Sequence, residues 1–481
     1  MSRPASLIAT LSCSPSPDGA DIAALPNAVE WLEVRADLVG DIDPDWLRNH
    51  FKGRLLYSLR SDATLPNRQQ RLQNAARFYD RLELQIETDL SEGMLAAVPG
   101  EKRLISWYGN AGELSDLTTQ FDRISSVPAA WYKLVTAPKT ISAEFLALSL
   151  LDTIKRDDTI VFANGPLGFW NRLLALQLGS PAIYGLAGGA GSAADMEPSI
   201  GKLIADYGLP EVRQAKELFA IVGNPIFHSL SPRLHNASYR EMDHPALFVP
   251  LRVDSFVEFW QEFVVSKKLD AFGLSINGMT VASPHKEEAV LTARTVSGMA
   301  RQCEAANIIV RNNGWWTADT TDPDVVYTAS QDCSVAVSEK RAAVIGCGGA
   351  GRAIAAALVE SGAGVTLINR GAERGEHAAE LLGLPYIPLR DFDAEGFDIV
   401  VNATPVGRDT DEVPFALDRL SNDAVVIDLV YGSRPTSLVS GTRARRQMAI
   451  DGRDVLVTQV RHQFRLMTGK EMPVNNIMKI L

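Results

Sequence analysis

The chain has 481 residues, 46% of them hydrophobic and 22% charged, and its formal net charge at pH 7 is −11. This length exceeds one ordinary hydrophobic core and predicts two or three domains. Acidic and basic residues are mixed along the chain and no apolar stretch reaches the ~18 residues of a membrane span, which argues against nucleic-acid and membrane partners.

The composition otherwise favours a cytoplasmic protein that acts on small molecules. The N-terminal segment lacks the core and cleavage site of a signal peptide, and the four cysteines show neither metal-ligand nor disulfide spacing. The cysteines therefore predict no metal site. Local arginines could hold small anionic substrates whatever the net charge, and we expect a monomer or homodimer.

Eight short apolar runs recur at a steady interval through the first 208 residues, and we expect each to form a strand. They cover residues 7–12, 29–37, 54–61, 81–87, 103–109, 130–137, 159–164 and 181–187. Segments of helical period, such as 67–80 and 142–156, lie between most of them. Eight strand–helix units in about 200 residues predict a (β/α)8 barrel over residues 1–210, and the alternative is an open doubly wound sheet.

Lys133 lies in the run AAWYKLVTAP, which otherwise has the pattern of a buried strand. Burial disfavours a charged lysine, so this side chain must be paired, reach water or act as a neutral amine, which is a nucleophile. In a barrel the C-terminal strand ends share one mouth. The candidates there are Glu33, Arg35, Arg60, Glu83, Tyr108 and Lys133.

A second domain begins where this spacing breaks, near residues 207–219, with a fresh strand at 218–225. A third segment follows 329–340, and residues 341–370 have the pattern of a strand, a glycine turn, a helix and a second strand. The whole chain is therefore expected to be α/β.

The turn in VIGCGGAGRA has the spacing G-x-G-x-x-G at Gly346, Gly348 and Gly351, after a β run and at the start of an alanine-rich helix. Such glycines let the backbone approach a pyrophosphate, which rests on the helix N-terminus. The alternative is a tight turn without a ligand.

The end of the second strand predicts which dinucleotide binds. Where an NAD site places a carboxylate, the chain has Asn369-Arg370, with Arg374 one helical turn on. A guanidinium grips a 2′-phosphate that a carboxylate would repel, so we predict NADP. Residues 398–407 suit a nicotinamide wall, or are an ordinary strand and turn. The candidate cofactor-binding residues are Gly346, Gly348, Gly349, Ala350, Gly351, Asn369, Arg370, Arg374 and Thr404.

Polar residues upstream of this turn suit a ketone substrate with a carboxylate. Ser229 and Ser231 supply hydroxyl donors, Lys286 follows a Pro-His turn, and Thr321 and Asp322 end the segment TADTTD. A ketone that is reduced at carbon needs a proton donor at its oxygen, which a lysine–aspartate pair can provide. The alternative is a solvated surface pair.

Residues 218–481 resemble shikimate dehydrogenase. The segments that occur in that family's order are SLSP…HN, SPHKE, AAN (305–307), TTD, GCGGAGRA, NR, NATPVG, DLVYGSRPT (428–436) and LVTQVRHQF…TG (456–469). The resemblance implies a substrate domain over 217–330, to which 460–481 returns, and an NADP-binding Rossmann domain over 338–459.

The same resemblance assigns roles to residues. It implies that Lys286 and Asp322 are catalytic. The substrate-binding residues would be Ser229, Ser231, Asn307, Thr321, Tyr431 and Gln459, with Asp322 also on a ring hydroxyl. Three positions depart from the family: Thr320 replaces Asn, and Thr280 and Ala282 stand where Asn-x-Thr is usual. Because Ala282 lacks a hydroxyl, binding could be weaker or shifted toward quinate.

Residues 1–208 resemble type I 3-dehydroquinate dehydratase. The matching segments are LEVRAD (32–37), SLRS (58–61), LELQ (82–85), ISWY (105–108), YKLVT (132–136), NRLLAL (171–176) and LGSPAIYG (178–185). The resemblance implies that Lys133 forms a Schiff base, that Glu33, Arg35 and Arg60 line the mouth, and that Arg172 takes the substrate carboxylate. Without it, an aldolase-like or a purely structural lysine stays open.

One catalytic part of the dehydratase family is missing. Its general acid/base histidine lies two residues after the Ser of ISWY, where this chain has Tyr108. We therefore expect a fused enzyme that dehydrates 3-dehydroquinate with turnover impaired by Tyr108 and reduces 3-dehydroshikimate to shikimate. The alternatives are a quinate/shikimate dehydrogenase with a non-catalytic barrel, and a ligand-binding regulator without turnover.

Overall fold

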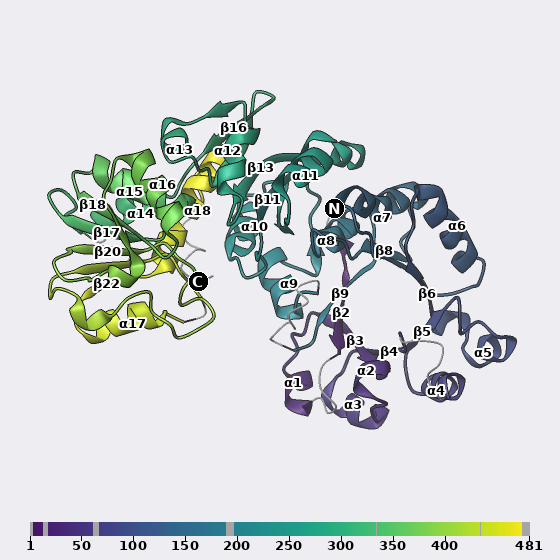
Figure 1. Ribbon diagram of the computed structural model, residues 1–481. Coiled ribbons are helices and arrows are strands. Elements are labelled where there is room, and N and C mark those ends of the chain that lie inside the picture. Colours follow the sequence, from purple (N-terminus) through teal and green to yellow (C-terminus); the bar gives the residue numbers. More distant parts are fainter. Residues whose placement is uncertain are drawn as a thin grey trace. The chain divides into compact units, whose positions relative to one another are not determined.

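The computed structural model describes residues 3–12, 18–60, 67–188, 197–332, 334–432 and 434–473 (Figure 1). The chain divides into two compact units. Unit 1 is Met1–Leu218 with Ile226–Ile276, and unit 2 is Phe219–Pro225 with Asn277–Leu481. None of the helices in the described ranges combines the length and apolar character needed to cross a bilayer.

Unit 1 contains the expected barrel, an eight-stranded parallel sheet in the order β8-β7-β6-β5-β4-β3-β2-β9. Its strands are β2 (Ser6–Leu11), β3 (Val29–Arg35), β4 (Arg54–Ser58), β5 (Arg81–Gln85), β6 (Arg103–Gly109), β7 (Trp131–Thr136), β8 (Thr159–Ala163) and β9 (Ala182–Leu186). The order brings the first and last strands together, because β2 pairs with both β3 and β9. The (β/α)8 prediction is thereby confirmed.

Helices follow the strands because apolar residues recur at helical period and polar residues cap the ends. Thr140 accepts a hydrogen bond from the Ala143 N–H at the start of α7, for example. The helices are α1 (Gly19–Ala23), α2 (Ala36–Val39), α3 (Pro44–His50), α4 (Arg68–Ala75), α5 (Glu92–Ala97), η1 (Gly100–Lys102), α6 (Leu114–Ser125), α7 (Ile141–Ile154), α8 (Trp170–Gln177) and α9 (Ile200–Tyr207). A short antiparallel pair, β1 (Arg3–Pro4) with β10 (Glu211–Val212), completes this part.

Residues 226–276 pack against the barrel helices within unit 1. They form α10 (Ser231–Glu241), β12 (Ala246–Arg252), α11 (Phe256–Phe259), η2 (Trp260–Val265) and η3 (Lys268–Phe272). The Phe263 ring centroid lies 5.6 Å from that of Phe145 and 5.1 Å from that of Trp170. Phe227 packs 5.2 Å from the Phe169 ring. The Phe227 ring also lies directly against Gly168, whose φ is +92°. A Cβ at position 168 would lie only 2.2 Å from Phe227 Cζ, so no larger residue fits there.

Unit 2 begins with a sheet in which β11, β13, β15, β16 and β14 lie side by side in that order. These strands are β11 (Glu217–Gly223), β13 (Ser275–Val281), β15 (Ile308–Asn312), β16 (Trp315–Asp319) and β14 (Thr295–Val296). The helices that accompany them are α12 (Lys286–Thr292), α13 (Gly298–Gln302), α14 (Asp324–Tyr327) and η4 (Thr328–Asp332). Lys286 thus starts a helix, and Asp322 follows the strand β16.

A second, fully parallel sheet of unit 2 has the order β19-β18-β17-β20-β21-β22. Its strands are β17 (Arg341–Ile345), β18 (Gly364–Asn369), β19 (Tyr386–Pro388), β20 (Ile399–Asn402), β21 (Val425–Asp428) and β22 (Met448–Ile450). The order reverses between β17 and β20, which is where a Rossmann sheet binds its dinucleotide. The Gly346 turn follows β17 at this point.

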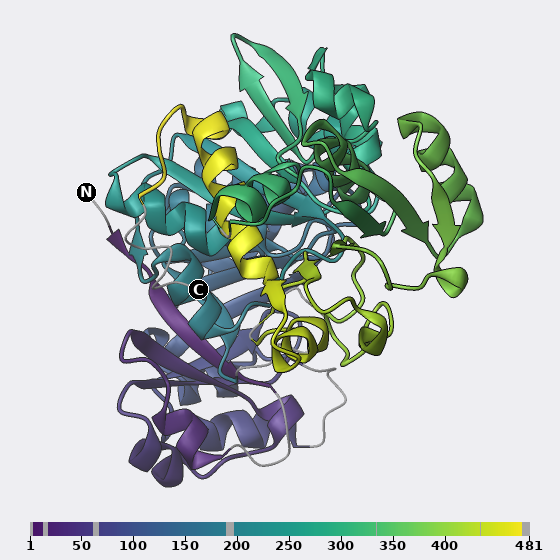
Figure 2. The ribbon, with the colours of Figure 1, turned by 90° about the vertical axis from the view of Figure 1, so that its left-hand side faces the viewer.

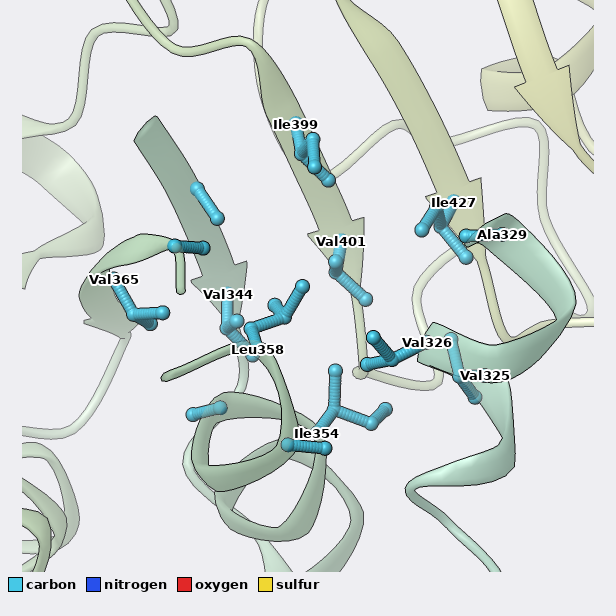
Figure 3. Close-up of a cluster of buried hydrophobic side chains, with 14 of the residues drawn as sticks. Val325, Val326, Ala329, Val344, Ile354, Leu358, Val365, Ile399, Val401 and Ile427 are labelled. Carbon is cyan, nitrogen blue, oxygen red and sulfur yellow. The ribbon is translucent and has the colours of Figure 1, made fainter. Parts of the chain in front are cut away.

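Helices cover this sheet and bury its aliphatic side chains. They are α15 (Gly349–Glu360), α16 (Ala372–Leu382), η5 (Leu389–Asp391), η6 (Leu417–Arg419), α17 (Ser437–Ala444) and α18 (Gly452–Thr468). Figure 3 shows Ile354 and Leu358 of α15 against Val344 and Val401 of the strands, all nearly inaccessible to water. The helix α18, yellow in Figure 2, contacts α14 and β15 of the other sheet of unit 2.

Candidate active sites

Lys133 lies inside the barrel of unit 1. It is on β7, its side chain is 1% exposed, and its Nζ is 2.8 Å from Oε1 of Glu83 on β5. Burial, followed by the positive charge of Arg60, lowers the pKa of Lys133 to about 8, with Glu83 opposing the shift. A usable fraction of this amine is therefore neutral near physiological pH, as a nucleophile requires.

Glu83 is an anion that gathers hydrogen-bond donors around Lys133. Burial would raise its pKa, but the charges of Lys133 and Arg60 outweigh burial and lower it. The Tyr108 hydroxyl donates to Oε1 of Glu83 at 2.5 Å, and the Ser58 hydroxyl donates to Oε2 at 2.9 Å. Burial and Glu83 together raise the pKa of Tyr108 well above its ordinary value. Tyr108 is therefore a neutral phenol bonded to Glu83, and a poor base.

Glu33 and Arg60 complete this cluster. Oε1 of Glu33 accepts from the Ser58 hydroxyl at 2.7 Å and from the Arg60 guanidinium, while Oε2 accepts from the Thr10 hydroxyl at 2.8 Å. Arg60 also contacts Glu83 at 3.3 Å. The structure thus brings together five of the six candidates at the barrel mouth.

The two other barrel arginines that the sequence predicted, Arg35 and Arg172, differ in their partners. Arg35 forms a two-fold hydrogen-bonded ion pair with Asp37, at 3.0 and 2.7 Å, instead of joining the Lys133 cluster. Arg172 is buried on α8, donates to Asn164 Oδ1 at 2.9 Å and lies 3.2 Å from Glu197. Burial lowers its pKa, and its Nε has no acceptor among the described residues. Arg172 therefore keeps donor capacity for a substrate anion.

Tyr184 on β9 is a neighbour of the site that motif reasoning did not select. Its ring centroid lies 4.7 Å from Lys133 Nζ, and its buried hydroxyl has no partner in the described parts of the chain. The signal in the sequence was that alternate residues of a strand point to the same side, which predicts that Tyr184 points into the barrel. An aromatic residue of the barrel core would show the same pattern.

In unit 2, Lys286 and Asp322 form an ion pair, with Lys286 Nζ 2.7 Å from Asp322 Oδ2. The other carboxylate oxygen, Oδ1, accepts from the Asn307 amide at 3.0 Å and from the Gln459 amide at 3.1 Å. Their exposed fractions are 18% for Lys286 and 4% for Asp322, so the pair is not the solvated surface pair considered above. Both oxygens of Asp322 are held, and the Lys286 ammonium has a fixed direction.

A second layer of amides and hydroxyls supports this pair. The Thr321 N–H donates to Asn307 Oδ1 at 2.8 Å, and the Thr321 hydroxyl accepts from the Gln463 amide at 3.0 Å. Gln463 in turn accepts from the Thr280 hydroxyl at 3.0 Å. Gln463 was not among the predicted residues, although it lies four positions after Gln459 and therefore on the same face of α18.

Three further predicted substrate residues are Ser229, Ser231 and Tyr431. Ser229 and Ser231 belong to unit 1, where both are buried at the start of α10 and the Ser231 N–H donates to the Ser229 hydroxyl at 3.2 Å. Tyr431 follows β21 and lines a pocket with Asp411 and Arg434. The residues lining that pocket do not include Lys286 or Asp322.

The glycine turn has the shape that a phosphate-binding loop needs. Gly346 has φ of +104°, and a Cβ on Gly351 would lie 1.7 Å from the Gly346 carbonyl oxygen. A Cβ on Gly349 would lie 2.7 Å from Ala305 Cβ and 3.1 Å from Lys286 Cβ. The first turn of α15, formed by Gly349, Ala350 and Gly351, therefore lies directly against Lys286. The free N–H groups of this turn can donate hydrogen bonds to a bound anion.

The residues predicted to bind the 2′-phosphate of NADP lie at and after the end of β18. Asn369 accepts from the Cys347 N–H at 3.1 Å and so fixes the turn. Arg370 and Arg374 are exposed, and neither forms an ion pair within the described ranges. Thr404 donates to Asn402 Oδ1 at 2.6 Å and borders Gly346. These residues fit a dinucleotide with an added phosphate.

Arg352 is a structural residue that the motif did not single out. It is buried on α15 and donates to the carbonyl oxygens of Cys303 at 2.8 Å and Glu304 at 3.2 Å. Its Nη1 also lies 2.9 Å from Glu287 Oε1 on α12. This one side chain joins the helix of the glycine turn to the helix that begins with Lys286.

Three family models match consecutive parts of the chain. Residues 20–221 match type I 3-dehydroquinase, residues 221–309 match the shikimate dehydrogenase substrate binding domain, and residues 341–432 match NADP oxidoreductase coenzyme F420-dependent. The shikimate dehydrogenase (NADP(+)) of Xanthomonas euvesicatoria pv. vesicatoria (strain 85-10) is 33% identical over 267 residues, which cover 52% of this chain and 90% of that protein. The chain belongs to the shikimate dehydrogenase family.

The similarity extends to the barrel. The chloroplastic bifunctional 3-dehydroquinate dehydratase/shikimate dehydrogenase of Arabidopsis thaliana is 28% identical over 418 residues, 82% of this chain and 68% of that protein. The crystal structure of the Aquifex aeolicus shikimate dehydrogenase matches with a TM-score of 0.50 and 28% identity, over 55% of this chain and 97% of that one. The resemblance to two fused families is thereby confirmed.

Proposed function

We propose that this shikimate dehydrogenase family member is a bifunctional enzyme of the shikimate pathway. Its N-terminal barrel dehydrates 3-dehydroquinate to 3-dehydroshikimate, and its C-terminal half reduces 3-dehydroshikimate to shikimate with NADP as cofactor. The observation that carries the proposal is the Lys286–Asp322 pair at 2.7 Å beside the glycine turn. The similarity to a fused protein of the same two activities supports it.

In the reductase, the chain's own residues handle the proton. Gly346, Gly351 and Arg370 would hold NADPH, which when bound would provide the hydride that the ketone carbon needs. The Lys286 ammonium, directed by Asp322, donates the proton that the ketone oxygen needs. In this scheme Asn307 and Gln459 fix Asp322 and contact ring hydroxyls, Thr321 supports them, and Tyr431 is a further substrate-binding residue. Ser229 and Ser231 take the substrate carboxylate.

In the barrel, the neutral amine of Lys133 adds to the substrate ketone, and loss of water gives an iminium. The iminium withdraws electrons and acidifies the neighbouring C–H bond, so that a second water can be eliminated. Arg172 takes the carboxylate, while Glu33, Arg35 and Arg60 line the mouth. Because the Tyr108 phenol is bonded to Glu83 and its pKa is raised, we expect slow turnover. A barrel that binds without turnover is the second candidate.

The domain limits belong to the same proposal: 1–210, 217–330 with 460–481, and 338–459. Residues 474–481 lie outside the described ranges. The assignment also includes small-molecule substrates, a cytoplasmic location and a monomeric or homodimeric state.

A spectrophotometric assay of the full chain tests the reductase assignment. We expect NADP reduction with shikimate, and slower reduction with NAD or with quinate. Faster turnover with quinate would favour a quinate/shikimate dehydrogenase, with Thr280 and Ala282 as the residues to restore. No turnover with any pair would favour the ligand-binding regulator.

Replacing Arg370 with alanine is expected to raise the KM for NADP by about 10- to 100-fold, because charged hydrogen bonds contribute about 1.5–3 kcal/mol. The KM for NAD should change little, since NAD lacks the 2′-phosphate. Arg390→Ala is the matched control, because Arg390 is 84% exposed and pairs only locally with Asp391. Equal changes for NADP and NAD would contradict the assignment.

The rate of Schiff-base formation is expected to increase with pH and to level off above about pH 9. The folded pKa of Lys133 is lowered from 10.5 to about 8, so the neutral amine gains population as the pH rises through 8. The measurement is the initial rate of borohydride-trapped adduct with 3-dehydroquinate, read by intact-protein mass. A rate that falls between pH 6 and 9 would show that an unprotonated amine does not limit the reaction.

A further inference from the structure

Glu144 is a buried carboxylate of the barrel with no part in the chemistry above. It lies on α7 with an exposed fraction of 0%, and it makes no ion pair within the described parts of the chain. Burial raises its pKa to about 8. An apolar side chain would cost less at such a position, so the carboxylate requires a reason.

The side-chain hydrogen bonds of Glu144 reach one segment, residues 164–171, which comprises the connection after β8 and the first two residues of α8. Oε1 accepts from the Leu167 N–H at 2.8 Å, and Oε2 accepts from the Trp170 indole N–H. The Glu144 backbone carbonyl accepts from the Asn171 amide at 2.9 Å. A Cβ on Gly165 would lie 2.2 Å from Glu144 Cγ, so the segment rests directly on this side chain.

The same segment places Arg172. Arg172 follows Asn171 in the first turn of α8, and its Nη2 donates to Asn164 Oδ1 at 2.9 Å, at the other end of the segment. Asn171 Oδ1 also accepts from the Ala163 N–H at the end of β8, at 2.9 Å. The position of the guanidinium therefore depends on a segment that Glu144 holds by two side-chain bonds, together with the Arg252 N–H, which donates to the Leu167 carbonyl at 3.1 Å.

We propose that Glu144 is a positioning residue that holds segment 164–171 so that Arg172 meets the carboxylate of the barrel's substrate. This inference rests on the proposed function of the barrel. Two donors held by one buried carboxyl group restrict the arrangement of the segment, and a displacement of about 1 Å at a binding group can cost up to about 10²-fold. Glu144 acts only through Arg172 and touches no reacting atom.

The test compares full-length wild type, Glu144→Gln and Glu144→Ala by borohydride trapping over a range of 3-dehydroquinate concentrations. A glutamine amide turns its NH2 toward one of the two N–H donors and so loses one bond. We expect the half-saturating concentration to rise about tenfold in Glu144→Gln and further in Glu144→Ala. The adduct rate at saturation should remain near wild type.

Two further variants separate positioning from general destabilisation. Leu148→Ala removes a fully buried side chain from the same helix and should leave half-saturation unchanged. In an Arg172→Ala background, Glu144→Gln should add no further loss, because its effect passes through the guanidinium. Wild-type half-saturation in Glu144→Gln, or additive losses, would overturn the inference. Absence of any wild-type adduct would instead overturn the barrel's proposed function and this inference with it.

Discussion

Replacing Lys286 with methionine is expected to lower the kcat of shikimate oxidation by about 10²- to 10⁴-fold, the range that a positioned proton-transfer group contributes. Methionine keeps an unbranched side chain of similar length but removes the ammonium that lies 2.7 Å from Asp322. The KM for NADP should change little, because Gly349 of the glycine turn lies beside the aliphatic Cβ and Cδ of Lys286, which methionine replaces with similar groups. Steady-state absorbance of NADPH gives both constants.

The matched control is Lys340→Met, which removes a half-exposed lysine paired at 3.5 Å with Asp398, just before the strands β17 and β20. Its kcat should stay within about twofold of wild type, as expected for a surface ion pair. A Lys286→Met enzyme within tenfold of wild type would show that another group supplies the proton. The reductase mechanism would then need a different donor.

Replacing Lys133 with methionine is expected to abolish both dehydration and the borohydride-trapped adduct with 3-dehydroquinate, because the bond to the substrate carbonyl forms at this nitrogen. The effect should exceed that of any other barrel substitution. Glu83 loses its 2.8 Å partner but keeps the Arg60 guanidinium and the Tyr108 hydroxyl, so the full chain should fold. Intact-protein mass and peptide mapping give the measurement.

Lys139→Met is the control for Lys133, since Lys139 is an exposed lysine just after β7. This variant should form the adduct at the wild-type rate, and the far-ultraviolet circular dichroism and melting temperature of both variants should match wild type, which reports that the barrel is folded. An adduct that persists in Lys133→Met would place the Schiff base on another lysine.

The fold could be predicted from the sequence because hydrophobic period and turn residues act locally. All eight expected barrel strands are present, and the glycine turn joins a strand to a helix as expected. The ends were less predictable: the run 29–37 stops as a strand at Arg35, where the ion pair with Asp37 closes the turn into α2. An ion pair between side chains two residues apart does not change the spacing of apolar residues, so that spacing could not predict where the strand ends.

The sequence predicted which residues form the candidate sites. It did not predict which other side chains each of them hydrogen-bonds. Motif spacing indicated Lys286, Asp322 and Lys133, but it could not indicate that Tyr108 is bonded to Glu83. The support of Thr321 by Gln463, and of the Arg172 segment by Glu144, arises from contacts between positions distant in the sequence. Such contacts depend on three-dimensional packing, which a single sequence does not encode in any local pattern.

Phe227 packs against Phe169 and Gly168 of the barrel. This packing limits where the chain could be divided into a separate barrel and a separate dehydrogenase. A break in the connecting stretch near residue 215 would release a barrel whose Phe145 and Trp170 have lost Phe263, their aromatic cover. Such a fragment would expose several rings to water and be prone to self-association. Fission into two independent proteins would therefore require new polar residues on α7 and α8, or retention of residues 226–276 by both products.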